Sequence, residues 1–440
     1  MEKKNNTNLL LIALILVLLI SAITIVGTIL LINSKKGSEP AQPKMQNKVA
    51  KENVVDDPGE DEPKEVSDAT DFDLKFLKLE NNGKNNIYSP LSLRYALYML
   101  RDGADEKTLE QIEDVLGEAT DVKKYENIDK VLSFANTIFI RDTYKDVVKE
   151  EYVDQVEKEY DAEINYDKFE SVDNINKWIE NKTLGQIKDL LKPEAINPDT
   201  EMALINALAI DMEWMDDFDT QDTYGKTFYL SDGKEMTATT MNKKFTSDSV
   251  SYYEGDDVTA VSLDLKEYGD KQLSFVAIMP NDEKLTDYVE DFEISDLEEI
   301  ENNMKTAEDA KNGLELSIPK FKYDYSLDLR KDLEALGMTD AFIPDTANFS
   351  NMTKKILWVD KAIHSANIDF SEEGVKAAAV TVFMMMDSAM VRENEPVKVE
   401  IDKPFLYFIK DKKSGEIWFV GTLYEPNNWE NDKADYYGEP

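Results

Sequence analysis

The most telling pattern of apolar and polar positions lies near the C-terminal end of the chain, in residues 375–386. These residues are mostly small or β-branched, as in strands that pack on a crowded pleated surface. Period-two alternation places six uncharged side chains on one face: Val375, Ala377, Ala379, Thr381, Phe383 and Met385. From the pattern alone, the segment predicts an ordinary core strand, a buried Ala-rich helix, or a strand held in reserve outside a sheet.

The residues after this segment form a tip without turn chemistry. The run 384–390, MMMDSAM, lacks the Gly, Pro and Asn residues that are typical of tight turns, and a charged stretch follows it. Exposed tips of this kind are preferred sites of proteolytic cleavage. We therefore expect an exposed loop here that proteases cut easily.

Two other strand-like segments carry one polar side chain each on an apolar face. In residues 363–370, His364 shares its face with the apolar even-numbered residues, and in residues 204–214 Asn206 does the same. A buried polar group without a partner costs about 1–3 kcal/mol. We therefore expect both side chains to lie inside the protein and to be hydrogen-bonded.

The N-terminal region contains a long apolar run. After a short segment, residues 1–8, residues 9–32 carry no charge and are long enough to span a bilayer as a helix of about 20 residues. A cleaved signal peptide has a shorter apolar core, of about 7–15 residues. The run predicts a single-pass signal anchor in the cell membrane with the folded domain outside the cell, and secretion after cleavage is the alternative.

Composition divides the rest of the chain. Residues 33–69 are rich in Pro, Glu, Asp, Asn and Lys, which predicts a disordered acidic linker. Helical spacing of apolar residues begins at Phe72, after a candidate helix cap at Thr70, and predicts one folded domain over residues 70–428. The acidic, Tyr-containing residues 429–440 predict a disordered or loosely packed C-terminal tail.

Charge and residue counts exclude several classes of function. The chain has 50 Lys and Arg against 90 Asp and Glu, a formal net charge of -40, which disfavours nucleic acids and glycosaminoglycans as partners. One histidine and no cysteine exclude multi-His and thiolate metal sites, and no GxSxG or phosphate-binding loop is present. We expect no metal, no cofactor and no enzymatic activity.

Five segments, in order along the chain, resemble motifs of the serpins, the protease inhibitors that trap enzymes by loop insertion. These are Asn86–Gly117, Ile175–Leu191, Leu204–Phe218, Leu336–Phe349 and Asp402–Thr422. The resemblance implies an α+β serpin fold: a large five-stranded mixed β-sheet, additional sheets, about nine helices and an exposed reactive-centre loop. It also implies a monomer whose partner is a serine protease.

The resemblance assigns roles to particular residues. The hinge of the loop comprises Glu372, Glu373, Gly374, Val375, Ala377, Ala378 and Ala379. A polar cluster beneath the main sheet, the shutter, comprises Ser89, Ser92, Asn206 and His364. Trp214 lies at the top of the sheet, although Asp211 and Met212 before it replace the Lys-Gly of many relatives, so the contacts there stay open.

By this resemblance, a protease that cleaves the loop is trapped when residues 374–388 insert into the main sheet. The usual spacing from the hinge places the scissile bond at Ser388–Ala389. The loop is longer than in many relatives, so the alternatives are Met386, Asp387, Met390 and Arg392. Small or apolar residues favour elastase-like, chymotrypsin-like or subtilisin-like proteases, whereas Arg392 favours trypsin-like ones. The competing hypothesis is a non-inhibitory serpin-fold protein that acts as a surface binding or scaffold module.

Overall fold

The computed structural model describes residues 69–117, 125, 127–196, 199–375 and 395–437. The apolar run 9–32 and the linker up to residue 68 lie outside the described residues. The chain divides into two compact units, residues 1–64 and 65–440, and the second is the one described. Within the described part, no helix is long and apolar enough to cross a membrane.

Nine α-helices are present in the described residues. They are α2 (Phe72–Leu79), α3 (Pro90–Gly103), α4 (Glu106–Leu116), α5 (Glu150–Tyr160), α6 (Asp173–Lys182), α7 (Leu285–Asp291), α8 (Ile294–Asn302), α9 (Leu329–Ala335) and α10 (Trp429–Tyr437). Helix α3 begins as its sequence predicts, because Ser89 caps it by accepting a hydrogen bond from the Ser92 amide and Pro90 occupies its first turn.

The main sheet contains five strands of five or more residues and two strands of two residues. The long strands are β2 (Leu132–Arg141), β3 (Glu163–Asp167), β4 (Met202–Ile210), β13 (Phe321–Asp328) and β14 (Lys361–Ser371). The short strands are β5 (Met212–Glu213) and β15 (Gly374–Val375). Parallel pairs, β2 with β3 and β4 with β14, lie beside antiparallel ones, which confirms the mixed sheet.

Two further sheets complete the fold. The strands of the first, in spatial order and all antiparallel, are β1 (Asn86–Tyr88), β18 (Ile417–Leu423), β17 (Phe405–Asp411), β10 (Leu273–Pro280), β9 (Val258–Asp264), β8 (Val250–Glu254) and β11 (Lys305–Thr306). The strands of the second are β16 (Val397–Glu400), β12 (Leu314–Pro319), β7 (Glu235–Phe245) and β6 (Thr223–Tyr229). The α+β class is confirmed.

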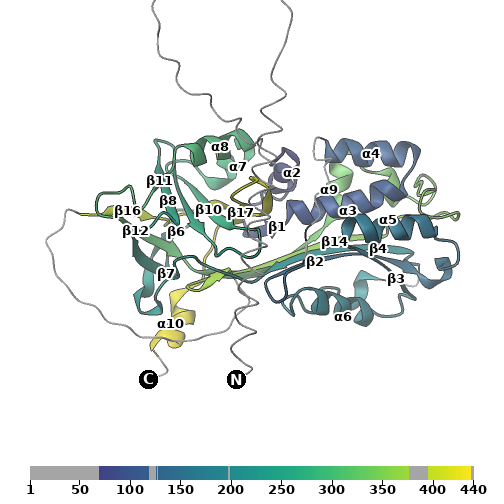
Figure 1. Cartoon of the computed structure of the whole chain (residues 1–440), viewed down its shortest axis with the longest axis horizontal. Coiled ribbons are helices and arrows are strands. Elements are labelled where there is room, and N and C mark those ends of the chain that lie inside the picture. Colours follow the sequence, from purple (N-terminus) through teal and green to yellow (C-terminus); the bar gives the residue numbers. More distant parts are fainter. Residues whose placement is uncertain (1–68, 118–124, 126, 197–198, 376–394, 438–440) are drawn as a thin grey trace, which may run out of the picture. The chain divides into compact units, whose positions relative to one another are not determined.

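Helices cover both faces of the main sheet, with α3 on one side and α6 on the other (Figure 1). Alternation along β4 follows these two layers. Leu204 and Leu208 belong to the large core that includes α3, whereas Ile205 and Ala207 pack with Ile175 of α6 in the smaller core. The face predicted for Asn206 is therefore the α3 face.

The C-terminal segment corrects one expectation. Residues 429–440 were expected to be disordered or loosely packed, but Trp429–Tyr437 form the helix α10. This helix lies against β6 and β7 (Figure 1). Its seat is built by residues far away in the sequence, and this is the reason that local composition did not indicate it.

Candidate functional site at the seam of the main sheet

The seam between β4 and β14 is closed at only one end. The two strands pair in parallel from Lys361 with Ala203 to Ser365 with Ala207. Farther along β14, the neighbour is no longer β4: Phe370 and Ser371 pair with β15, and β15 in turn pairs with β5. The main sheet is thus zipped at one end and held apart by a two-residue wedge at the other.

The wedge is the first part of the predicted hinge. Val375 pairs with Phe370 on one side and with Met212 on the other, and its side chain is buried. Gly374 passes so close to β5 that a Cβ there would lie 2.1 Å from the Met212 carbonyl oxygen, so the position requires glycine. The resemblance implies insertion from Gly374 onward after cleavage, but Gly374 and Val375 already pair in the sheet of the uncleaved chain.

Trp214 lies beside the wedge, where the sheet-top residue was predicted. Its indole Nε1 donates to the Ser371 carbonyl at 2.8 Å and its backbone N–H donates to the Glu373 carbonyl at 3.0 Å. The ring packs edge-on against Phe370, with centroids 5.2 Å apart. One residue therefore fixes both the end of β14, through its side chain, and the turn that leads into β15, through its backbone.

Glu372, at this turn, is a buried carboxylate with two side-chain partners. It accepts from Lys320 Nζ at 3.0 Å and from the Tyr436 hydroxyl at 2.6 Å. Burial alone would raise its pKa, but the Lys320 ammonium and the Tyr436 hydroxyl hold the pKa of the Glu372 carboxyl below its ordinary value. Sequence reasoning anticipated neither Lys320 nor Tyr436.

The four predicted shutter residues lie together at the zipped end of the seam. Ser92 Oγ donates to Asn206 Oδ1 at 2.5 Å, and the Ser89 amide donates to His364 Nε2 at 3.0 Å. His364 Nδ1 lies 3.1 Å from Asn206 Oδ1, and Asn206 and His364 are a register pair across the seam. The cluster joins the start of α3 to both strands.

These contacts fix the protonation state of the histidine. Because Nε2 accepts from an amide and Asn206 Oδ1 can only accept, the neutral tautomer that carries its proton on Nδ1 satisfies both bonds. A second proton on Nε2 would face the Ser89 N–H. Burial lowers the pKa of His364 to about 3, so the ring stays neutral over the physiological range.

A fifth member of the cluster was not predicted. Asn136 of β2 accepts a hydrogen bond from Asn206 Nδ2 and extends the network to a third strand. The segment 132–141 gives no period-two signal, because its polar residues Ser133, Asn136 and Thr137 fall on both faces of the strand. All three are buried in the structure. Of the other predicted positions, Ala377, Ala378, Ala379 and the candidate cleavage residues 386–392 lie outside the described residues.

A buried group of three charges lies elsewhere in the core. Arg94 of α3 is 3.1 Å from Glu416 Oε1 and 3.7 Å from Asp73 Oδ1, and all three side chains are buried. Burial raises the pKa of Asp73 to about 6 although Arg94 opposes the shift. The group ties α2 and α3 to the start of β18 and does not reach the seam.

Comparison with known proteins identifies the family. The family model described as "Serpin (serine protease inhibitor)" matches residues 69–426. An uncharacterized serpin-like protein of Methanosarcina acetivorans is 31% identical over 82% of this chain and 87% of its own, and mouse neuroserpin is 28% identical over 82% and 90%.

A solved structure agrees with this assignment. The crystal structure of the thermophilic serpin tengpin in its native state aligns with a TM-score of 0.69 and 28% identity, over 86% of this chain and 97% of tengpin. The family model, the sequence relatives and the solved structure therefore agree, and each covers more than four fifths of the chain. The chain belongs to the serpin family.

Proposed function

We propose that this protein inhibits serine proteases as a suicide substrate. A target protease attacks the loop and forms an acyl-enzyme. The freed loop then extends β15 between β5 and β14 and continues down the seam between β4 and β14. About 15 inserted residues, at about 3.3 Å each, carry the acylated protease some 50 Å before hydrolysis finishes.

The single observation that carries this proposal is the wedge of Gly374 and Val375 at the end of the seam where β14 no longer pairs with β4. Two residues in a strand between two others leave ladder positions of the neighbouring strands that a longer insert can pair. Backbone pairing and apolar burial that are withheld before cleavage are the driving force for insertion after it. Val375, at the first inward position, carries no charge.

Ser388–Ala389 is the scissile bond that we propose, on the spacing from the hinge. Cleavage there favours elastase-like or subtilisin-like proteases, because the residue before the bond is small. We also propose that residues 9–32 anchor the protein in the cell membrane and that residues 33–69 tether the serpin domain outside the cell.

The proposal is tested by mixing the purified full-length chain, kept in mild detergent, with elastase, subtilisin, chymotrypsin or trypsin. We expect a covalent complex at the summed mass on denaturing gels with at least one protease. Mass spectrometry of the released C-terminal fragment then identifies the cleaved bond. Cleavage by every protease without a complex would overturn inhibition and favour the scaffold hypothesis.

Val375→Arg is the matched hinge variant for this experiment. The Val375 side chain is buried in the sheet, so an arginine there would place a charge in the buried strand β15 from which insertion starts. We expect the variant to be cleaved at the same bond as the parent chain but to form no complex. Unchanged complex formation by the variant would refute the hinge assignment.

A further inference from the structure

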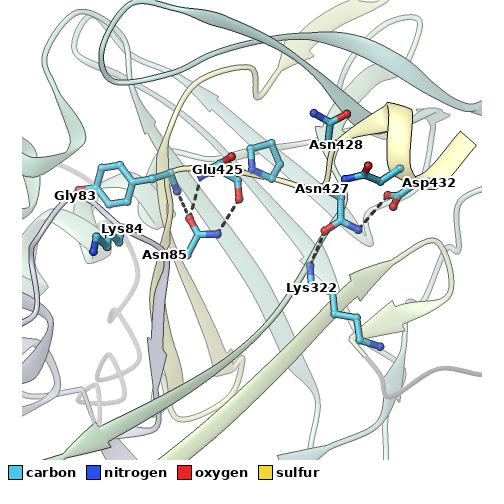
Figure 2. A pocket seen from close by; sticks show the side chains of 11 residues that line it. Gly83, Lys84, Asn85, Lys322, Glu425, Asn427, Asn428 and Asp432 are labelled. Atoms are coloured by element: carbon cyan, nitrogen blue, oxygen red, sulfur yellow. Dashed lines mark hydrogen bonds between the residues drawn. The ribbon is translucent and has the colours of Figure 1, made fainter.

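Helix α10 lies beyond the part of the chain that the family model matches, which ends at residue 426, and the fold holds it in a specific seat. Asp432 accepts from Thr239 Oγ1 at 2.8 Å and from Asn427 Nδ2 at 3.0 Å. Asn427 in turn accepts from the Lys322 amide at 3.1 Å, so the segment before α10 is pinned to the start of β13 (Figure 2).

The edge strand β6 makes room for this helix. Gly225 lies within β6, and a Cβ at this position would approach the Trp429 ring to 2.6 Å. Glycine is unfavourable in the interior of a strand, so close approach of another group is the physical reason for its presence. The indole of Trp429 also packs against Tyr436, with ring centroids 5.5 Å apart, and this contact orients the Tyr436 ring.

Tyr436 carries the helix to the hinge. Its hydroxyl donates to Glu372 Oε1 at 2.6 Å and accepts from Lys320 Nζ at 2.8 Å, while Lys320 also contacts Glu372 Oε2. The Lys320 ammonium lies 5.3 Å from the centroid of the Tyr436 ring. Each of the three side chains thus contacts the other two, and the carboxylate among them belongs to Glu372, three positions before Val375.

We propose that Tyr436 is a positioning residue for the inhibitory reaction: through Glu372, α10 holds the turn between β14 and β15 so that Gly374 and Val375 stay in the sheet. The inference rests on the proposed inhibitory function for its consequence, but the positioning itself is a property of the uncleaved protein. Glu372 also accepts from the Phe218 amide through its backbone carbonyl, at 2.9 Å. Glu372 is therefore held through its backbone by Phe218 and through its side chain by Tyr436, together with Lys320.

Loss of the Tyr436 hydroxyl should shift the hinge toward a state in which β15 has left the sheet. A hydrogen bond to a charged group changes such an equilibrium by about tenfold or more. After acylation, insertion would then begin from a hinge that is no longer between β5 and β14. Slower insertion gives hydrolysis more time, so a larger share of encounters ends in a cleaved inhibitor and a free protease.

The chain offers a clean probe of the hinge because it contains no cysteine. Val375→Cys introduces a single thiol at a buried position of β15, and its rate of reaction with a thiol reagent reports how often β15 leaves the sheet. We expect Tyr436→Phe, which keeps the ring contacts, to raise this rate about tenfold. Tyr224→Phe, at an exposed tyrosine of β6, is the matched control and should leave the rate unchanged.

A second thiol separates hinge release from general loosening. Ser365→Cys places the probe at the zipped end of the seam, where we expect no effect of Tyr436→Phe. Equal rates at position 375 with and without Tyr436→Phe would overturn the proposal, and so would an equal increase at positions 365 and 375. Both measurements are made without a protease, so they decide the positioning role even if the proposed inhibition fails.

The consequence for inhibition is measured separately as the number of inhibitor molecules consumed per protease trapped. We expect Tyr436→Phe to raise this number while the midpoint of thermal unfolding of the intact protein changes little. A purely structural role for α10 would instead lower the unfolding midpoint and leave the stoichiometry of trapping unaltered. That result would also contradict the proposal.

Discussion

Replacement of His364 by glutamine should remove a specific loss of stability in mild acid. The chain has one histidine, and in the folded protein both ring nitrogens are used, Nε2 as acceptor from Ser89 and Nδ1 as donor to Asn206. Burial lowers its pKa from 6.5 to about 3. Between these values the unfolded chain binds a proton that the folded chain does not, so acid favours unfolding.

The size of the effect follows from the two pKa values. Each pH unit below about 6.5 costs roughly 1.4 kcal/mol of unfolding free energy, until the pH approaches about 3. From about pH 7.5 to pH 5.5 the loss is therefore about 1.4 kcal/mol, most of it below pH 6.5. Raised carboxyl pKa values act in the opposite sense: burial raises the pKa of Asp73 and of Asp332 to about 6, so the stability that their protonated forms contribute is lost as the pH rises from 3.8 to about 6.

Comparison of two proteins cancels the carboxyl contributions. Urea unfolding of the parent chain and of His364→Gln, followed by tryptophan fluorescence at several pH values, gives the difference in pH dependence between them. We expect the parent to lose about 1.4 kcal/mol more than the variant over that interval, whatever their absolute stabilities. Parallel pH profiles would show that His364 is not held neutral, and the hydrogen-bond assignment of the cluster would fall.

Two further substitutions test other parts of the structure. Gly374→Ala should displace the hinge from the sheet, because the new Cβ would lie 2.1 Å from the Met212 carbonyl oxygen. We expect this variant to form fewer covalent complexes at an unchanged rate of loop cleavage. The control is Glu395→Ala, at an exposed residue at the other end of the loop, which should behave as the parent chain. Arg94→Met leaves the buried carboxyls of Asp73 and Glu416 without their cation and should cost about 3–5 kcal/mol in urea unfolding. The control is Arg330→Met, which breaks the half-exposed ion pair with Glu334 and should lower the free energy of unfolding by less than about 1 kcal/mol. Equal losses of unfolding free energy in Arg94→Met and Arg330→Met would refute the reasoning.

Sequence patterns predicted the shutter pair because alternation has a fixed period in strands. His364 and Asn206 each interrupt an apolar face, and that face is buried whichever strands are neighbours. Asn136 escaped prediction because β2 is buried on both faces, and a doubly buried strand has no polar side to set the phase. Their meeting across the seam depends on strand order, which only the family resemblance supplied.

The pairing of the hinge residues within the sheet, and helix α10, escaped prediction for a different reason. Each depends on the shape of a distant partner. Gly374 and Val375 pair in the sheet only because β5 and β14 lie apart at that level. Helix α10 has no apolar stripe from which a helix could be predicted. Its seat comes from Gly225 and Thr239, about 200 residues earlier in the chain. Local composition carries no record of such contacts.

The register of the wedge also links the hinge to the shutter. Phe370 pairs with Val375 and Ser371 with Gly374, so each step back along β14 corresponds to one step forward along the loop. Under the proposed mechanism, continued pairing in this register brings Thr381 opposite His364. A strand inserted there would place the backbones of His364 and Asn206 two inter-strand spacings apart, about 9.6 Å, whereas they are now neighbours. The 3.1 Å contact between Nδ1 and Oδ1 would then be lost.

Under the proposed mechanism, insertion would therefore have to break the bond from His364 Nδ1 to Asn206 Oδ1 when it reaches that level. The loop would supply a replacement, because a threonine hydroxyl both donates and accepts, and alternation places Thr381 on the face otherwise made of Val, Ala, Phe and Met. With a valine there, His364 and Asn206 would each lose a partner in a buried site. Under the proposed mechanism, the barrier to insertion would lie at the shutter, whereas Trp214 and Glu372 would set the position from which insertion starts.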